Sequence, residues 1–270
     1  MPERLIVDQG EFEAFCEHAR EMRLVAFDSE FVAEHTYTPE LCLLQFATAD
    51  RVVGVDPYKV HDLCLELSGK RPTNLVDVQL AEGLRSRSYP LAFDSLVARV
   101  LGRRTKGKET RTDWRQRPLS SKQIDYALED VEPLLKVWET QTKSLRKRGR
   151  YEWAIAEFER MVDDIAADLE RPAWHKLPGL HRLSPREFAA AIELAEWRER
   201  EAKSKNRPVR KLLRDDLIVE LARRQPKTIQ DLGATRDMNR GDYRRYFDEM
   251  LACLDRVREL PKESLPKPPE

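Results

Sequence analysis

The chain has 270 residues, which is enough for one large domain or two ordinary ones. Hydrophobic residues make up 41% of it and charged residues 36%, so a sizeable core with large solvated surfaces is expected. The net charge is zero, which means that a polyanionic partner must be held by local basic patches. The sequence has no apolar run long enough for a membrane span and no signal-peptide pattern at its start, so we expect no membrane partner.

The four cysteines, Cys16, Cys42, Cys64 and Cys253, are scattered and form no CxxC pair. This pattern argues against a zinc site. It is typical of a protein from a reducing compartment, and we expect a cytoplasmic location.

The first part of the chain alternates between predicted strands and helices. Short apolar runs predict strands over 4–8, 23–28, 41–47 and 51–55. Helical spacing of apolar residues predicts helices over 10–20, 59–68, 75–85, 91–101, 120–147 and 150–169. The intervening stretch 103–118 is basic, polar and irregular. An α/β domain over 1–170 is therefore expected.

A break rich in proline and glycine, RPAWHKLPGLHRL, follows this domain and predicts a boundary. Beyond it, Ser184, Pro185 and Glu187 are typical of a helix start. Further helices are expected near 211–224, 228–234 and 240–259. We therefore predict a small all-helical domain over 180–260 and a disordered, proline-rich tail over 261–270.

Two carboxylates, Asp28 and Glu30, follow the apolar residues of "VAFDSEF". Residues two apart on a strand share a face, so their mutual repulsion needs compensation. A hard divalent cation such as Mg²⁺, which takes oxygen ligands, would supply it. The alternative is a solvated strand end or a helix cap, because short motifs often match by chance.

A second pair, Tyr126 and Asp130 in "IDYALEDVEPLL", lies four residues apart on a predicted helix and shares one face. Asp130 lies at the edge of the apolar stripe, within reach of an internal site. A phenol beside a carboxylate can orient a water molecule. The alternative is a surface acid beside a half-buried tyrosine.

Together, these pairs resemble the DEDD 3′–5′ exonucleases whose third motif is Y-x-x-x-D. The blocks "DSEFVAEHTYTPELCLLQFA" and "KGKETRTDWRQRPLSSKQIDYALEDV" are similar to ribonuclease D, and "LSPREFAAAIELAEWREREAKSKNRPVRKLL" is similar to an HRDC domain. The resemblance implies an α/β fold: a ribonuclease H-like exonuclease domain, with a mixed sheet flanked by helices, followed by a small all-α HRDC domain.

The resemblance also implies a two-metal site. Two Mg²⁺ or Mn²⁺ ions about 3.5–4 Å apart would hold the scissile phosphate and activate a water. Asp28 would bridge both ions, Glu30 and Asp130 would each complete one coordination sphere, and Tyr126 would position the nucleophile.

A fourth carboxylate, from the family's second motif, is not apparent. The chain runs "VGVDPYKVHDLCLELSGKRPTNLVDVQ", where the family has a further strand and helix. Asp62 could substitute for it. Asp77 is a second candidate, although that position resembles a helix cap. In the third alternative the site is incomplete, and the missing strand leaves an open sheet edge or gap.

Basic residues form candidate nucleic-acid contacts, which give affinity without base specificity. One set lies near "TDW" and another in the helical domain, and the candidates are Arg104, Lys106, Lys108, Arg111, Arg207, Arg210 and Lys211. Trp114 could stack on a base or pack on the neighbouring helix. The alternative for each basic set is a solvated surface.

The expected function is metal-dependent 3′–5′ trimming of RNA, with tRNA precursors as the substrate that the resemblance implies. One alternative is an RNA-binding protein with impaired catalysis. Another is a DNA exonuclease, since RNA selectivity requires 2′-hydroxyl contacts that this sequence does not reveal. No protein partner can be inferred.

Overall fold

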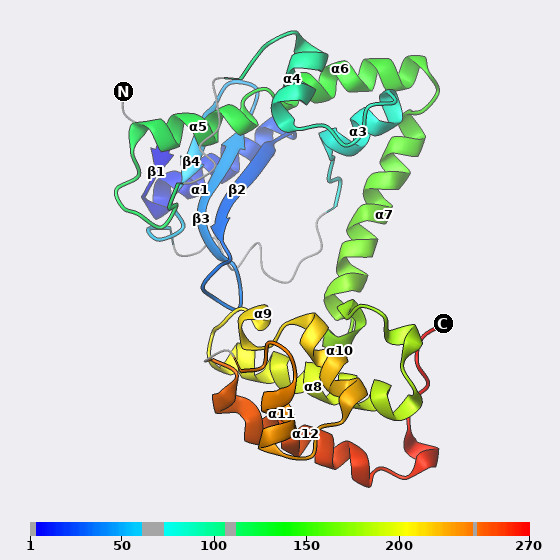
Figure 1. Ribbon diagram of the computed structural model, residues 1–270. Coiled ribbons are helices and arrows are strands. Elements are labelled where there is room, and N and C mark those ends of the chain that lie inside the picture. Colours follow the sequence, from blue (N-terminus) through cyan, green and yellow to red (C-terminus); the bar gives the residue numbers. More distant parts are fainter. Residues whose placement is uncertain (1–3, 61–72, 106–111, 240–241) are drawn as a thin grey trace. The chain divides into compact units, whose positions relative to one another are not determined.

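The computed structural model describes residues 4–60, 73–105, 112–239 and 242–270 (Figure 1). Contacts divide the chain into two compact units. Unit 1 comprises Met1–Val32 and Glu40–Leu169, and unit 2 comprises Ala33–Pro39 and Glu170–Glu270. The division after Leu169 falls at the start of the proline-containing break.

Unit 1 is built on a mixed sheet whose strand order is β1-β4-β3-β2. The strands are β1 (Leu5–Ile6), β2 (Ala26–Val32), β3 (Glu40–Ala47) and β4 (Val52–Val55). β1 is parallel to β4, whereas β3 is antiparallel to both β2 and β4. The expected mixed sheet is confirmed, and β2 forms one edge of it in the described part of the chain.

Strand β2 extends beyond the predicted end at residue 28. Its pairing with β3 continues through Asp28 opposite Gln45 and Glu30 opposite Leu43, with a register shift between Glu30 and Phe31. The prediction ended the strand too early because it followed apolar residues, whereas backbone pairing tolerates polar side chains at a sheet edge. Asp28 and Glu30 therefore lie within a strand and share one face.

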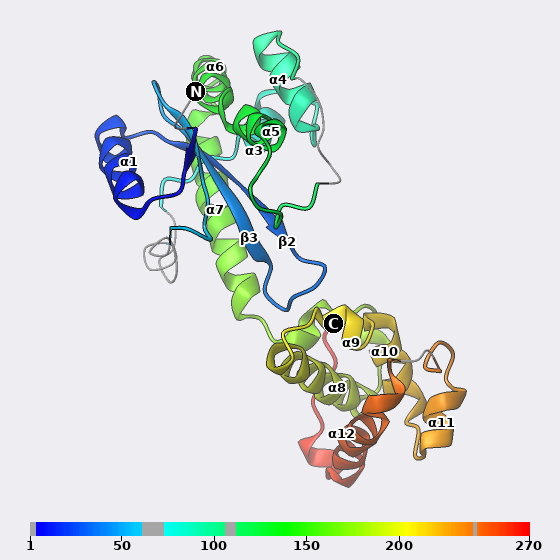
Figure 2. The same cartoon turned by 90° about the vertical axis from the view of Figure 1, so that its left-hand side faces the viewer.

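Helices cover both faces of the sheet, and Figure 2 shows α1 and α5 on opposite sides of it. From α1, Phe15 packs with Val53 and Val55. From α5, Ala127 packs with Cys42 and Leu43. The helices of this unit are α1 (Gln9–Met22), α3 (Val78–Arg85), α4 (Phe93–Leu101), α5 (Ser121–Val131), α6 (Leu134–Lys147) and α7 (Tyr151–Glu170).

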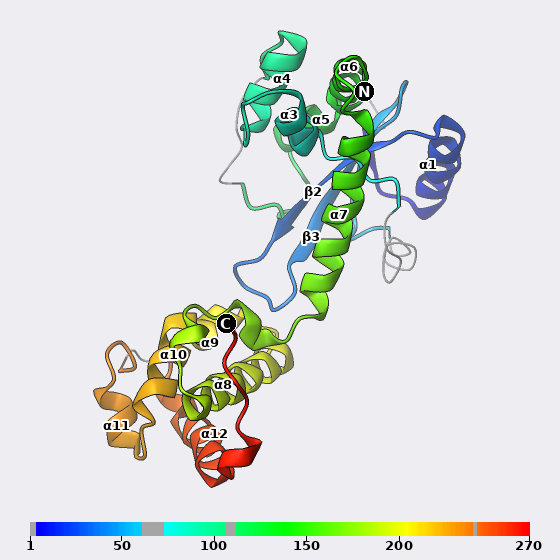
Figure 3. The same cartoon turned by 90° about the vertical axis from the view of Figure 1, so that its right-hand side faces the viewer.

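The helix predicted over 120–147 is instead two helices, α5 and α6, separated at Pro133. Proline has no N–H to donate to the helical ladder, which explains the break. Helix α6 packs against α3 and α4, and the three lie together in Figure 3. Most of the helix predicted over 59–68, Asp62 included, lies outside the described residues.

Unit 2 is helical. Its α-helices are α8 (Pro185–Ser204), α9 (Val209–Leu212), α10 (Asp215–Arg224), α11 (Ile229–Ala234) and α12 (Phe247–Glu259). Its core is contiguous and includes an edge-to-face contact between Trp197 and Tyr246 at 5.7 Å. Ser184 and Glu187 form the expected capping box of α8.

Three predictions for this unit differ from the structure. The segment 211–224 is not one helix, because extended Leu213 separates α9 from α10. The last helix begins at Phe247 rather than near residue 240. The tail, which was predicted to be disordered, contains a short 3₁₀ helix, Lys262–Ser264, and Leu265 lies against the core. No helix in the described ranges is long and apolar enough to cross a membrane.

Candidate active site

The two sequence motifs meet at the sheet edge. Asp28 and Glu30 lie on β2, which α5 contacts directly. Tyr126 and Asp130 lie one turn apart on α5, and each side chain shifts the pKa of the other. Pairs about one hundred residues apart in the sequence therefore form one cluster.

The charges of this cluster act on one another. Burial raises the pKa of Glu30 to about 7, and the negative charges of Asp28 and Asp130 add to this effect. Burial likewise raises the pKa of Asp130 to about 6, Asp28 adds to this, and the hydrogen bond from Tyr126 opposes it. Burial, followed by the charges of Asp130 and Glu30, raises the pKa of Tyr126 to about 12, which keeps its hydroxyl protonated at neutral pH.

A cavity of about 830 Å³ lies beside the cluster. The β2 edge, residues 73–78, and parts of α4, α5, α6 and α7 form its walls. Its acidic lining residues are Asp28, Asp77, Asp94, Glu129 and Asp130, and no Lys, Arg or His is among the described residues that line it. Asp94 and Glu129 belong to no sequence motif, so residue spacing alone did not indicate them.

Asp77 has a structural role. Its carboxylate caps α3 by accepting hydrogen bonds from the backbone amides of Gln79 and Leu80, at 2.7 and 3.0 Å. This is the helix cap that its sequence position resembled.

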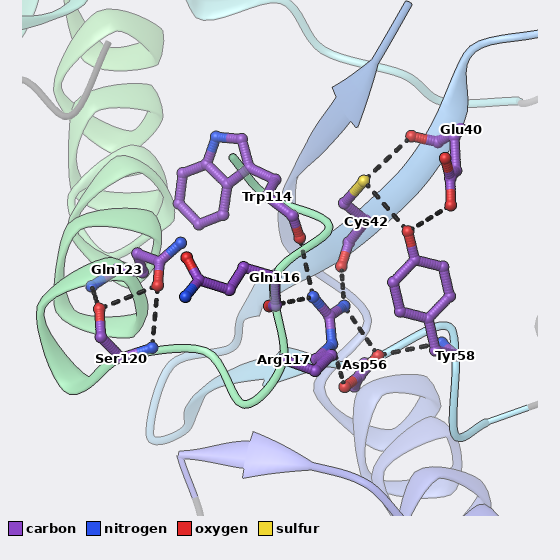
Figure 4. Close-up of polar contacts among 9 residues, drawn as sticks. All are labelled: Glu40, Cys42, Asp56, Tyr58, Trp114, Gln116, Arg117, Ser120 and Gln123. Atoms are coloured by element: carbon purple, nitrogen blue, oxygen red, sulfur yellow. Dashed lines mark hydrogen bonds and ion pairs between the residues drawn. The ribbon is translucent and has the colours of Figure 1, made fainter. Parts of the chain in front are cut away.

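The start of α5 is held in place by two contacts (Figure 4). Ser120 and Gln123 form a capping box. The backbone N–H of Gln123 donates to the Ser120 hydroxyl at 3.2 Å, and the backbone N–H of Ser120 donates to the side-chain oxygen of Gln123 at 2.9 Å. The preceding loop is anchored by Arg117, which donates two hydrogen bonds to Asp56, at 2.7 and 2.9 Å, and one to the carbonyl of Cys42 at 2.6 Å.

Asp56 is only 2% exposed, so Asp56 and Arg117 form a buried ion pair. The Asp56 carboxylate also accepts a hydrogen bond from the backbone N–H of Tyr58. Arg117 further donates to the Trp114 carbonyl and lies over the Tyr58 ring at 4.4 Å. This network fixes the loop that leads into α5, and through that helix it positions Tyr126 and Asp130.

Trp114 is 6% exposed and packs beside Tyr126, with ring centroids 6.3 Å apart. The structure therefore supports the packing alternative for Trp114, since a buried ring offers little of its face to a base.

The remaining basic candidates are placed as follows. Arg104 is exposed, whereas Lys106, Lys108 and Arg111 lie outside the described residues. In unit 2, the Arg210 side chain is 79% exposed and pairs with Asp215 at 3.1 Å, and Lys211 is exposed. Arg207 lies 3.7 Å from Asp242.

The donor chemistry of the cluster fits divalent cations. Asp28, Glu30 and Asp130 are hard oxygen donors that repel one another in a metal-free protein. Within the described ranges, no three acidic, histidine or cysteine side chains converge closely enough to hold one ion.

Comparison with known families and proteins agrees with this site. A 3′–5′ exonuclease family matches over residues 4–68 and 62–146, and an HRDC domain matches over 187–254. Ribonuclease D of Nitrobacter hamburgensis is 31% identical over 296 residues, covering 97% of this chain and 77% of that protein. Ribonuclease D of Bartonella henselae is 32% identical, covering 88% of this chain and 65% of that protein.

Solved structures give the same result. The crystal structure of Escherichia coli RNase D, described as an exoribonuclease involved in structured RNA processing, matches with a TM-score of 0.86 and 25% identity over 99% of this chain and 78% of that chain. The catalytic core of RRP6 from Trypanosoma brucei shares the fold, with a TM-score of 0.64 and 16% identity over 94% of this chain and 79% of that chain.

The fold and site define a class, a 3′–5′ exonuclease domain followed by an HRDC domain. Within that class the chain belongs to the ribonuclease D family, and its activity is that of a 3′–5′ exoribonuclease with an RNA substrate. Exonucleases of this family generally depend on divalent metal ions.

The comparisons also bear on the segment that the sequence lacks. The alignment to the Nitrobacter protein spans 296 positions, more than the 270 residues of this chain, so it includes positions with no counterpart here. The exonuclease match is broken into two ranges that overlap at residues 62–68. The chain therefore departs from the family pattern close to the expected second motif.

Proposed function

We propose that this protein removes nucleotides from the 3′ ends of RNA, with tRNA precursors as its substrate class, by a two-metal hydrolysis that uses Mg²⁺ or Mn²⁺. The observation that carries the proposal is the meeting of Asp28, Glu30 and Asp130. Asp28 and Asp130 line a cavity that has no basic side chain in its described lining, and their charges act on Glu30. Such a cavity repels a phosphate unless cations are bound.

The roles of the residues follow from their chemistry. Asp28, Glu30 and Asp130 would hold the ions, with Asp28 shared between them. When bound, the ions neutralise charge on the scissile phosphate and activate a water. The Tyr126 hydroxyl, which is protonated at neutral pH and bonded to Asp130, would orient that water by donating or accepting a hydrogen bond.

The fourth carboxylate is part of the same proposal. Asp62 remains a candidate for it, and the support comes from sequence alone, since the second range of the exonuclease match begins at residue 62. RNA affinity would come from Arg104 in unit 1, from Arg207, Arg210 and Lys211 in unit 2, and from the basic residues of 106–111. These contacts are electrostatic and should be sensitive to salt.

We further propose a cytoplasmic location, since the four cysteines are scattered along the sequence without a CxxC pair, a pattern typical of a protein from a reducing compartment.

An RNA-binding protein with impaired catalysis is the second candidate. It is favoured by the departure from the family pattern near the second motif. Loss of one metal ligand would impair hydrolysis while leaving the basic contacts of both units in place.

The test is an RNA with a 5′ label and a free 3′ end, incubated with the protein and Mn²⁺. Stepwise shortening is expected, and Asp28→Ala should abolish it. Asp164→Ala, a change to an exposed acid paired with Arg160 on α7, should leave it intact. Unshortened RNA that is still retarded on a native gel would instead support the binding protein.

A matched pair of variants tests the RNA contacts. The double change Arg210→Gln with Lys211→Gln should weaken RNA binding and reduce the slope of log affinity against log salt by about 1.5, because two phosphate contacts are lost. Arg223→Gln with Lys227→Gln removes the same charge elsewhere in unit 2 and should leave that slope unchanged. Equal slopes in the two double variants would contradict the assignment of Arg210 and Lys211 as RNA contacts.

A further inference from the structure

The tip of the β2–β3 hairpin does not belong to the same compact unit as its strands. Residues 33–39 are part of unit 2, whereas both strands of the hairpin lie in unit 1. The chain therefore passes between the two units at both ends of this tip as well as after residue 169. One of the two strands that the tip joins is β2, which carries Asp28 and Glu30.

Tyr37 attaches this tip to the rest of unit 2 in three ways. Its hydroxyl donates a hydrogen bond to the carboxylate of Glu199 on α8, and its backbone N–H donates to the side-chain oxygen of Asn206 at 3.1 Å. Its ring is partly buried and packs against the core of unit 2. The hydrogen bond to Glu199 raises the pKa of Tyr37 to about 12, so the hydroxyl stays protonated and remains a donor at neutral pH.

The two hydrogen-bond partners of Tyr37 are themselves held within unit 2. Glu199 belongs to α8, whose buried residues contribute much of the core of this unit. Asn206 follows the end of α8, and its backbone N–H donates to the carbonyl of Lys203 at 3.2 Å. The tip is therefore attached to a packed helix and to a hydrogen-bonded turn.

Strand β2 has little other support near its acidic residues. In the described part of the chain it pairs with β3 on one side only, and Phe27 and Phe31 are 54% and 56% exposed. The register shifts between Glu30 and Phe31, and the ladder ends at the pair Val32–Glu40, where the tip begins. Strand ends are among the parts of a fold that open most readily, so β2 is expected to open from this end.

The acidic residues add a second reason for the strand to open. Asp28 and Glu30 share one face of β2, so their negative charges repel each other in the metal-free protein. A hairpin that is held at its tip opens less often, because opening from that end requires Tyr37 to leave its partners in unit 2.

We infer that Tyr37 is a positioning residue for the active site: by attaching the hairpin tip to unit 2, it keeps Asp28 and Glu30 in place on β2. The inference rests on the proposed function, in which these two acids hold the ions. It gives unit 2 a role besides RNA affinity, namely support for the strand that carries the acids.

Hydrogen–deuterium exchange of the full chain in EDTA, read by mass spectrometry without RNA, tests this role without requiring activity. Tyr37→Ala should speed the exchange of the β2 amides about tenfold or more, because a packed ring and a hydrogen bond to a charged group are lost. The amides of α12, in the core of unit 2, should change less. Unchanged exchange in β2 would overturn the inference. Equal acceleration in β2 and α12 would also overturn it, since Tyr37 would then only stabilise unit 2.

Trp174→Ala is the matched control. Trp174 also packs against the core of unit 2, with its ring centroid 5.2 Å from that of Phe188, but it lies outside the hairpin. This variant should speed exchange in unit 2 and leave β2 unchanged. If it accelerates β2 as much as Tyr37→Ala does, the attachment at Tyr37 is not what holds the strand.

Two variants of Glu199 change the hydrogen bond alone and serve if Tyr37→Ala expresses poorly. Glu199→Gln keeps an acceptor for the Tyr37 hydroxyl and should retain slow exchange in β2. Glu199→Leu removes the acceptor and should accelerate it. The same β2 exchange in both variants would contradict a role for this hydrogen bond in holding the hairpin.

Activity separates this inference from the proposed function. With labelled RNA and Mn²⁺, Tyr37→Ala should lower kcat about tenfold, because misplaced groups slow the chemical step. Its RNA affinity in EDTA should not change, since Arg210 and Lys211 are intact. Normal kcat in Tyr37→Ala would overturn the inference and leave the proposed function standing. Trimming that survives Asp28→Ala, or no trimming at all, would contradict the proposed function, and the exchange of β2 would still decide whether Tyr37 holds the strand.

Discussion

Replacing Glu30 by glutamine should stabilise the metal-free protein at neutral pH. Glu30 lies on β2 with its carboxylate partly buried and close to the charges of Asp28 and Asp130. Burial, and then those charges, raise its pKa from 4.5 to about 7. Glutamine has nearly the same shape and no charge, so it removes these costs and keeps the strand position filled.

The magnitude follows from the difference in proton affinity between the folded and unfolded states. Because the folded state holds the Glu30 proton more tightly, the free energy of unfolding falls as pH rises from about 4.5 to about 7. Because Glu30 is only partly buried, solvent screening reduces this loss to about 1–2 kcal/mol over the whole interval. Glu30→Gln should abolish the loss, so at pH 8 its free energy of unfolding should exceed that of the unchanged protein by about 1–2 kcal/mol.

Urea unfolding in EDTA at pH 4.5, 6 and 8 measures the effect. Glu17→Gln, the same change at an exposed position on α1, is the control and should follow the unchanged protein at every pH. Mn²⁺ should reverse the order at pH 8, because the ions then bind the protein that has Glu30. If the free energy of unfolding depends on pH in the same way for both variants in EDTA, burial and the charges of Asp28 and Asp130 do not raise the pKa of Glu30, and the reasoning is refuted.

Two further predictions concern the supports of α5. Arg117→Met leaves Asp56 buried without its partner and should lower the free energy of unfolding by about 3–5 kcal/mol. Arg115→Met removes an exposed pair and should leave the free energy of unfolding close to that of the unchanged protein in the same urea titration. Ser120→Ala removes the helix cap and should cost about 1 kcal/mol, while Ser121→Ala should change stability by less than about 0.5 kcal/mol; equal costs for the two serines would contradict the cap assignment.

Local patterns predicted the parts of the site that lie within single elements. The spacing of Asp28 and Glu30 identified one face of a strand, and the spacing of Tyr126 and Asp130 identified one face of a helix. Both patterns work because side-chain direction follows from backbone periodicity.

Tertiary contacts decided what the sequence left open. In the sequence, Trp114 could equally stack on a base or pack against a helix. Only its burial against Tyr126 in the folded structure favours packing. Asp94 lies on a helix that was predicted, but no periodicity indicates that this helix faces α5 across a cavity. Arg117 was not singled out, because its partner Asp56 is distant in the sequence.

The departure from the family pattern lies close in the chain to residues that line the acidic cavity. The exonuclease match breaks at residues 62–68, and residues 73–78, which follow soon after in the chain, line the cavity together with Asp28 of β2. The basic residues of unit 2 belong to a separate compact unit, and their sequence matches the HRDC family without a break. Cation binding and RNA affinity should therefore respond independently to mutation.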